Sequence, residues 1–178
     1  MSIEVHASRG TSLNADVVAF CPYEGCSSLM SCGCYELIPE EPPRRTGQLS
    51  LLSSAHDRLE EINVIDDIGV LDCSWLPPEP SGPRLLAVAT SAGTAQLFEL
   101  HGEPLDSQPL PELLAASKIV CEGSGVCMSL AWSESHHHHR LVVTSTSGML
   151  YTAELLPTGL NLLHAWQVVF CTYVSVTA

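Results

Sequence analysis

The sequence predicts an all-β fold, an incomplete β-propeller of about three blades. One pattern occurs three times: a hydrophobic alternation that ends on an aromatic residue, a polar loop, and an apolar run of small residues that ends at glycine. The aromatic residue, Phe20, Trp75 or Trp132, precedes the apolar run by 9, 10 and 9 residues. Residues 86–100 also align with residues 141–155 at a constant offset of 55. This regular spacing indicates that each copy is one supersecondary unit.

The first blade is predicted to contain four short strands, because apolar and polar residues alternate between turn-forming segments. The segment 39–47 is predicted to be a loop, since its prolines cannot donate hydrogen bonds to a strand ladder. The four strands are expected at residues 17–20, 29–34, 48–52 and 59–64.

The second and third blades follow the same plan. Between them lies a proline-rich connection, in which we expect one helical turn over 111–116 before a strand at 119–121. The second blade is expected to use residues 70–75, 85–90 and 94–100, and the third residues 126–132, 141–145, 149–155 and 160–165.

Three blades do not close a ring, because propellers typically use four to eight. We therefore divide the chain into propeller blades over 1–167 and a divergent apolar tail over 168–178. We expect either that the chain is the first part of a longer protein or that it is a shortened product whose exposed blade edges favour association. The uncharged, β-prone tail is expected to promote aggregation.

The composition is that of a soluble, acidic, globular chain. Seven Lys and Arg residues stand against 20 Asp and Glu residues, for a net charge of −13 over 178 residues. This balance argues against nucleic acid as a partner, since no basic stripe is present to contact phosphates. Residues 1–11 lack the apolar core of a signal peptide, so we expect a cytoplasmic location, and polar residues interrupt the apolar stretch 160–178, so we expect no membrane span.

Two segments near the start of the chain carry a resemblance to a known family. Residues 10–26 and 29–37, followed by 47–49, 68–75 and 126–133, are similar in order and spacing to the WD-repeat diphthamide biosynthesis proteins, the diphthine methyl ester hydrolases. The resemblance covers residues 10–167, although the WD dipeptides are replaced by Glu99-Leu100 and Glu154-Leu155. It implies a WD-repeat propeller.

The resemblance also implies a function. That function is hydrolysis of the methyl ester on the modified histidine of translation elongation factor 2, which would be the protein substrate, without a cofactor. The catalytic residues of the family cannot be placed on this chain and remain unknown. A non-catalytic propeller fragment that only binds protein is the alternative.

Ester hydrolysis requires a nucleophile or an activated water, a base and an oxyanion site. Gly123-Ser124-Gly125 lacks the G-x-S-x-G spacing of a nucleophile elbow, so we interpret it as a turn between blades. His56 with Asp57, and Asp66 with Asp67, are the places where a base or a carboxylate is expected in a loop. Trp75 and Trp132 are interpreted as core residues.

Two groups of residues have the chemistry of metal ligands. Residues 136–139 are four consecutive histidines, and Cys32 and Cys34 are expected on one side of a strand, downstream of Cys21 and Cys26. We interpret the histidines as a solvated loop and the cysteines as buried free thiols, because the eight cysteines form no C-x-x-C pair and no secretion signal is present. No metal is therefore expected.

Overall fold

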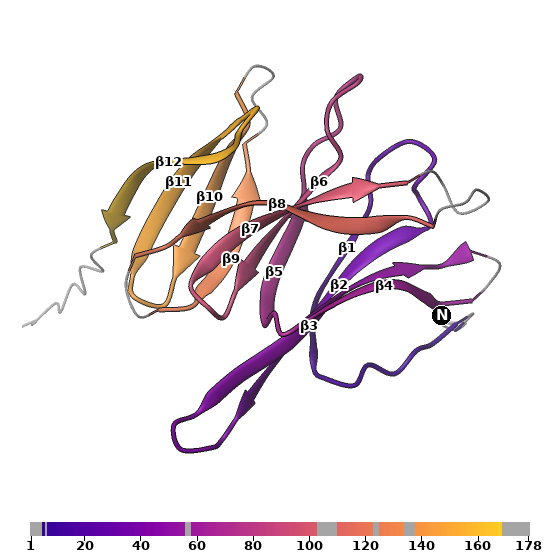
Figure 1. Cartoon of the computed structure of the whole chain (residues 1–178), viewed down its shortest axis with the longest axis horizontal. Coiled ribbons are helices and arrows are strands. Elements are labelled where there is room, and N and C mark those ends of the chain that lie inside the picture. The colour runs from indigo at the N-terminus through magenta and orange to yellow at the C-terminus, as the bar shows by residue number, and fades with distance from the viewer. Residues whose placement is uncertain are drawn as a thin grey trace, which may run out of the picture.

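The computed structural model describes residue 5 and residues 7–55, 58–102, 110–122, 125–133 and 138–168. These residues form three four-stranded antiparallel sheets that stand side by side in chain order (Figure 1). This arrangement confirms the predicted all-β, incomplete WD-repeat propeller. Within the described ranges, no helix has the length and apolar character needed to cross a membrane.

Each blade is formed by four strands that are consecutive in the sequence. Blade one contains β1 (Ala15–Phe20), β2 (Leu29–Ile38), β3 (Arg44–Ser53) and β4 (Glu60–Asp66). Blade two contains β5 (Val70–Trp75), β6 (Leu85–Thr90), β7 (Thr94–His101) and β8 (Glu112–Val120). Blade three contains β9 (Cys127–Trp132), β10 (Arg140–Ser145), β11 (Met149–Leu156) and β12 (Gly159–Gln167). The described chain ends at Val168, so most of the predicted tail lies outside the described residues.

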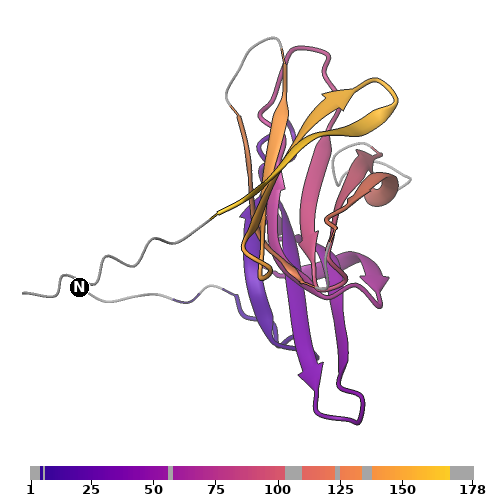
Figure 2. The same ribbon diagram turned by 90° about the vertical axis from the view of Figure 1, so that its left-hand side faces the viewer.

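The predicted repeat is confirmed in the two later blades, because β10 and β11 begin 55 residues after β6 and β7. Two predictions of local structure are wrong. The helical turn expected over 111–116 is wrong, because residues 112–116 belong to β8, which pairs with β7 through Leu100 and Leu113 among others. Residues 44–47, expected in a loop, belong to β3, where they pair with the end of β2. The resulting β2–β3 hairpin projects from the body of blade one (Figure 2).

Two apolar cores join the blades. The first lies between blades one and two and contains Leu49 and Leu51 from β3 together with Val88 and Phe98. The second lies between blades two and three and contains Leu97, Leu141 and Tyr151. Blade two is therefore covered by apolar contacts on both faces, because alternate residues of each strand point to opposite sides of the sheet.

In blades two and three, a tryptophan at the end of the first strand connects the blade to the one before. Trp75, at the end of β5, donates its indole Nε1–H to the Ala19 carbonyl of β1 at 3.2 Å. Trp132, at the end of β9, donates to the Ser74 carbonyl of β5 at 3.1 Å. Both acceptors immediately precede the aromatic residue of their own strand, so the two contacts are equivalent. The predicted core role of both tryptophans is confirmed by this position.

Two turns show why the repeat ends on glycine. Gly93 and Gly148 have φ angles of 71° and 75°, and each donates its N–H to the residue three positions earlier, Thr90 or Ser145. A positive φ is readily adopted by glycine but is strained for a residue with a Cβ. The surroundings differ, since a Cβ on Gly93 would lie 2.6 Å from the Gly125 carbonyl oxygen, whereas one on Gly148 would have its nearest neighbour at 3.9 Å.

We predict that Trp75→Phe lowers the free energy of unfolding by about 2 kcal/mol, because it removes the indole hydrogen bond and leaves a void in the first core. Trp166→Phe is the matched control. Trp166 is 48% exposed, and we expect a change within about 0.5 kcal/mol. Urea unfolding of the two variants measures the difference. Equal effects would contradict the structural role of the Trp75 contact.

We also predict that Gly93→Ala is clearly more destabilising than Gly148→Ala. Both variants incur the strain of a positive φ, about 1–2 kcal/mol, and Gly148→Ala should show little else. Gly93→Ala adds a clash with backbone at the junction of blades two and three. Thermal and urea unfolding compare the two variants directly. Equal losses in the free energy of unfolding would contradict the prediction, because they would show that the backbone moves to relieve the clash without loss of stability.

Candidate functional site

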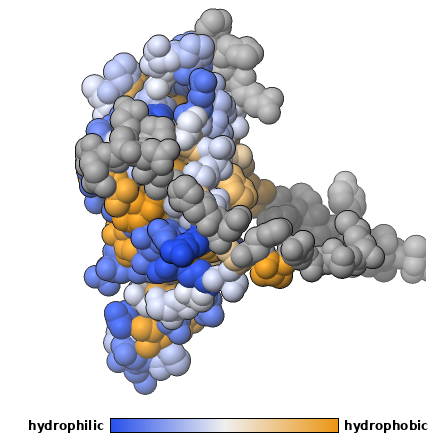
Figure 3. Space-filling model, turned by 90° about the vertical axis from the view of Figure 1, so that its right-hand side faces the viewer, coloured by the Kyte–Doolittle hydropathy of each residue, from blue (hydrophilic) through white to orange (hydrophobic). Residues whose placement is uncertain are grey.

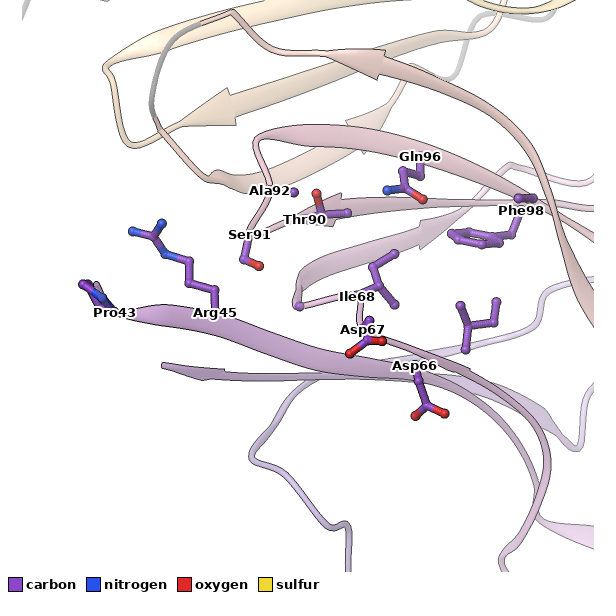
Figure 4. A pocket seen from close by; sticks show the side chains of 13 residues that line it. Pro43, Arg45, Asp66, Asp67, Ile68, Thr90, Ser91, Ala92, Gln96 and Phe98 are labelled. Carbon is purple, nitrogen blue, oxygen red and sulfur yellow. The ribbon is translucent and has the colours of Figure 1, made fainter. Parts of the chain in front are cut away.

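A cavity of about 440 Å³ with both polar and apolar walls lies between blades one and two. Its walls come from five parts of the fold: the beginning of β3, the β4–β5 connection, the β6–β7 turn, and the bodies of β7 and β8. Figure 4 shows Arg45, Asp67 and Ser91 around this space, with the apolar side chains of Ile68 and Phe98 farther in. The cavity is therefore a joint product of two blades.

The end of β4 and the short β4–β5 connection position the two carboxylates, Asp66 and Asp67. Asp67 has a φ of 60°, a left-handed conformation that aspartate tolerates better than most residues. Two residues later, the Gly69 carbonyl accepts a hydrogen bond from the backbone N–H of Ser91 at 2.7 Å. This hydrogen bond ties the connection to the β6–β7 turn. It brings an acidic loop of blade one close to the hydroxyl-bearing turn of blade two.

Two polar residues of the cavity are hydrogen-bonded to residues outside its lining. Asp66 accepts a hydrogen bond from the Gln48 side chain at 3.0 Å, and in Figure 4 its carboxylate points away from the Thr90 and Ser91 hydroxyls. The Thr90 hydroxyl lies 2.7 Å from the Thr94 hydroxyl, so it is used to close the turn. Asp67, Arg45 and Ser91 are left to define the polar character of the cavity.

This arrangement is suited to recognition of a charged or hydrogen-bonding segment. The described lining combines two carboxylates, a guanidinium and hydroxyl groups, and it contains neither histidine nor cysteine. A hydroxyl nucleophile requires a base within hydrogen-bond distance. Among the described residues, no hydrogen bond joins the Ser91 hydroxyl to a base, and the lining offers charged and hydrogen-bonding groups that can bind a ligand.

The other residues singled out in the sequence are distributed over the fold. His56, Asp57, Gly123, Ser124, His136 and His137 lie outside the described residues. His138 Nδ1 is 3.1 Å from Glu154 Oε1, and His139 Nε2 is 3.1 Å from Glu79 Oε1. The second contact joins the β9–β10 loop to the β5–β6 loop of the neighbouring blade. These histidines are therefore next to carboxylates on two different elements.

The four cysteines considered as a ligand set are not brought together. Cys21 and Cys26 belong to the core between blades one and two, whereas Cys32 and Cys34 lie on the opposite face of the blade-one sheet. Within the described chain, all seven cysteines are free and buried, as predicted for packing thiols. Burial raises the pKa of Cys21 to about 12 and that of Cys34 to about 11, which keeps these thiols protonated at neutral pH.

A second cavity, of about 660 Å³, lies between blades two and three. It is mainly apolar, with walls that include Leu85, Leu97, Leu155 and Pro157, and Glu99 is its charged residue.

Sequence reasoning found neither cavity in full, because each combines residues from blades whose relative packing the local pattern does not define. It found Asp66 and Asp67 because they lie at the end of β4 and at the start of the connection that follows it.

We predict that stability falls between pH 9.0 and about pH 11. Burial raises the pKa of the Cys73 thiol from 9.0 to about 11, so the folded protein keeps a proton that the unfolded chain loses. The contribution of the protonated Cys73 thiol to the free energy of unfolding is fully present below pH 9.0. It is lost as the pH rises toward 11, by up to about 2 kcal/mol. Urea unfolding across this pH range should show that the free energy of unfolding falls less steeply with pH in Cys73→Ala than in the unaltered protein. Parallel declines would contradict this prediction.

The comparisons with known proteins agree with the fold. The chain is 33% identical to human "Diphthine methyltransferase" over 144 residues, which is 69% of this chain and 31% of the human protein. It is 32% identical to the mouse protein of the same name over 145 residues, 74% of this chain and 30% of that protein. The chain thus spans less than a third of the length of these relatives. No family model matches.

The crystal structure of Chaetomium thermophilum Sqt1, a WD-repeat propeller, superposes with a TM-score of 0.71 over 90% of this chain and 37% of that chain. At 13% sequence identity, this likeness concerns the fold alone. The sequence identity to the two diphthine methyltransferases shows the family relationship, and the blade architecture agrees with it. Together they place this chain among the WD-repeat diphthamide biosynthesis proteins.

Proposed function

We propose that this protein acts in diphthamide biosynthesis, by hydrolysing the methyl ester of the diphthine intermediate on translation elongation factor 2. The observation that carries the proposal is the 33% identity to human diphthine methyltransferase over 144 residues. We place this activity in the cytoplasm. Because the chain spans 31% of that relative, the activity is proposed for a protein that contains these blades and further ones.

The relatives' name indicates chemistry on the methyl group of diphthine, and two reactions fit it. Methyl transfer would form the ester and needs a methyl donor. Hydrolysis would remove the methyl ester. Water attacks the ester carbonyl, the acyl–oxygen bond breaks, methanol departs, and a carboxylate remains. We favour hydrolysis because residues 10–26 and 29–37 resemble the ester hydrolases of this pathway.

The proposed role of these blades is to recognise the protein substrate. A net charge of −13 favours a basic partner surface, because opposite charges increase the rate of encounter. The cavity between blades one and two presents Asp67 and Arg45, which suits charged side chains on that surface. The catalytic groups are expected on other blades, since a hydrolytic site must hold base, water and oxyanion donors in fixed geometry.

A non-catalytic role in protein binding is the second candidate. It is supported by the same cavity, whose described lining contains hydroxyl and carboxylate groups without a histidine or a cysteine. In this case the chain binds elongation factor 2 but leaves its methyl ester unchanged. The two candidates therefore differ in whether a protein containing these blades releases methanol.

The experiment uses methylated elongation factor 2 purified from cells that lack diphthine methyltransferase. We predict that the full-length human relative removes the methyl group, seen by mass spectrometry of the modified histidine peptide, and that this chain alone does so at least about tenfold more slowly. In water labelled with heavy oxygen, hydrolysis places the label in the new carboxylate, whereas methyl transfer does not.

Two results would change the proposal. If the full-length relative leaves the methylated factor unchanged while this chain binds it, the hydrolase proposal fails and the binding role replaces it. If this chain clears the ester as fast as the full-length relative, hydrolysis stands, and the requirement for further blades is wrong. A heat-denatured sample of each protein is the control for background hydrolysis.

A further inference from the structure

The Ser91 hydroxyl is a buried polar group that lines the cavity between blades one and two. Ser91 is 9% exposed, and among the described residues no hydrogen bond reaches its hydroxyl. This hydroxyl lies over Gly69, where a Cβ would clash with it. A buried hydroxyl without a partner is unfavourable. The cavity is therefore suited to a ligand group that completes this hydrogen bond.

Two further acceptors line the same cavity. The Gln96 side chain donates through its nitrogen to the Thr94 hydroxyl at 3.2 Å, and in the described chain its carbonyl oxygen accepts no hydrogen bond. The Asp67 carboxylate likewise has no hydrogen bond or salt bridge to a described residue. Figure 4 shows Ser91 and Gln96 on blade two and Asp67 in the β4–β5 connection, with Ile68 between them. Three groups that can accept a hydrogen bond thus surround one space.

The apolar walls of the cavity suit an aliphatic chain. Ile68 and Phe98 belong to the core between blades one and two, and both line the cavity. Methylene groups that lie on them are removed from water, which is favourable. A lysine side chain combines four methylenes with an ammonium group that has three N–H donors and no acceptor. Those donors match the three acceptors, whereas the planar guanidinium of arginine suits acceptors that lie in one plane.

The charges of the cavity favour a cation over an anion. Two carboxylates, Asp66 and Asp67, line it against one guanidinium, that of Arg45. In Figure 4 Arg45 lies at the end of the cavity away from Phe98, whereas Asp67 lies beside Ile68. An ammonium group next to Asp67 therefore gains an opposite charge in a partly buried position, where such attraction is stronger than in water.

The β2–β3 hairpin adds a wall that the other blades lack in this form. Its two strands have ten residues each, against six and eight in β6 and β7, and the extension brings Pro43 and Arg45 to the cavity. The hairpin is the lowest part of the molecule in Figures 1 and 3, and its surface in Figure 3 is mostly hydrophilic. Arg45 is thus placed to pair with an acidic residue next to a lysine in a bound segment.

We propose that this cavity binds one lysine side chain of a protein partner, with the ammonium group held by Asp67, Ser91 and Gln96. The methylenes of the lysine lie on Ile68 and Phe98. The inference rests on the recognition role proposed above for these blades and deepens it, because it names the side chain that enters the cavity. All five residues belong to blade two or to the β4–β5 connection.

The first test adds blocked tripeptides, with lysine, arginine or norleucine between two glycines, to the full chain labelled with nitrogen-15. Nuclear magnetic resonance reports binding through the backbone amides of Ile68, Ser91 and Gln96. We predict saturable shifts with the lysine peptide. Binding of the norleucine peptide should be at least about tenfold weaker, because it keeps the aliphatic chain but lacks the charged donor. No shifts with the lysine peptide, or equal or tighter binding of either other peptide, overturns the proposal.

The second test compares variants with the lysine peptide. Asp67→Asn should weaken binding about tenfold, and Ser91→Ala about threefold, because the first removes a charge-assisted hydrogen bond and the second a neutral one. Asparagine tolerates the left-handed conformation of residue 67, so the fold is expected to persist. Asp16→Asn is the matched control, since Asp16 is exposed and lies outside the cavity lining. Thermal unfolding establishes that each variant is folded. Equal binding by Asp67→Asn and Asp16→Asn overturns the proposal.

The same preparations separate this inference from the proposed function. Binding of elongation factor 2 to the chain and removal of its methyl group by the full-length relative are measured alongside the peptides. If the lysine peptide fills the cavity but the factor is neither bound nor demethylated, the lysine site stands and the proposed function fails. If no peptide shifts the cavity amides while the factor is demethylated, the proposed function stands and the lysine site is wrong.

Discussion

Packing between blades is the interaction on which the rest of this structure depends. A four-stranded sheet with apolar side chains on both faces cannot bury either face from water by itself. Blade two shows the consequence, since Val88 and Leu97 are buried against different neighbours. The tryptophan contacts orient this packing, because an indole N–H that must reach one particular carbonyl allows few rotations of one sheet on the next. The cavity between blades one and two exists because that rotation is defined.

The strands could be predicted because their signal is local. Alternation of apolar and polar residues, with glycine or proline at the ends, determines where a strand begins and ends. The first part of β8 was missed because residues 112–118 consist largely of good helix formers, such as Glu, Leu, Ala and Lys, whereas the strand expected at 119–121 overlaps its end. Pairing with β7 overrides that preference, since the outer edge of β7 otherwise lacks a hydrogen-bond partner. The extension of β3 through Arg44 and Arg45 was missed because the nearby prolines indicate a loop.

The candidate site could be predicted only in part, for a related reason. Asp66 ends β4 and Asp67 begins the connection to β5, where polar residues are informative in themselves. Ser91 and Arg45 carry no such signal, because one lies in a tight turn and the other in a strand of a different blade. The backbone bond from Ser91 to Gly69 brings these segments together, and no local pattern identifies that partner. The missing information is the packing of one repeat on another.

Comparison of the repeats with one another yields information that no single repeat contains. The same aromatic position is occupied by Phe20, Trp75 and Trp132, yet only the latter two find a carbonyl acceptor among the described residues. Since the phenylalanine side chain has no N–H, the first blade can pack on a neighbour through apolar contact without leaving a buried side-chain donor unpaired. At the other end, threonines occupy positions of Ala89 and Leu97, so the outer face of blade three tolerates water better than the faces inside the arc. The two ends of the chain therefore differ in polarity, and the apolar end at Phe20 is the one that gains most from a neighbouring blade.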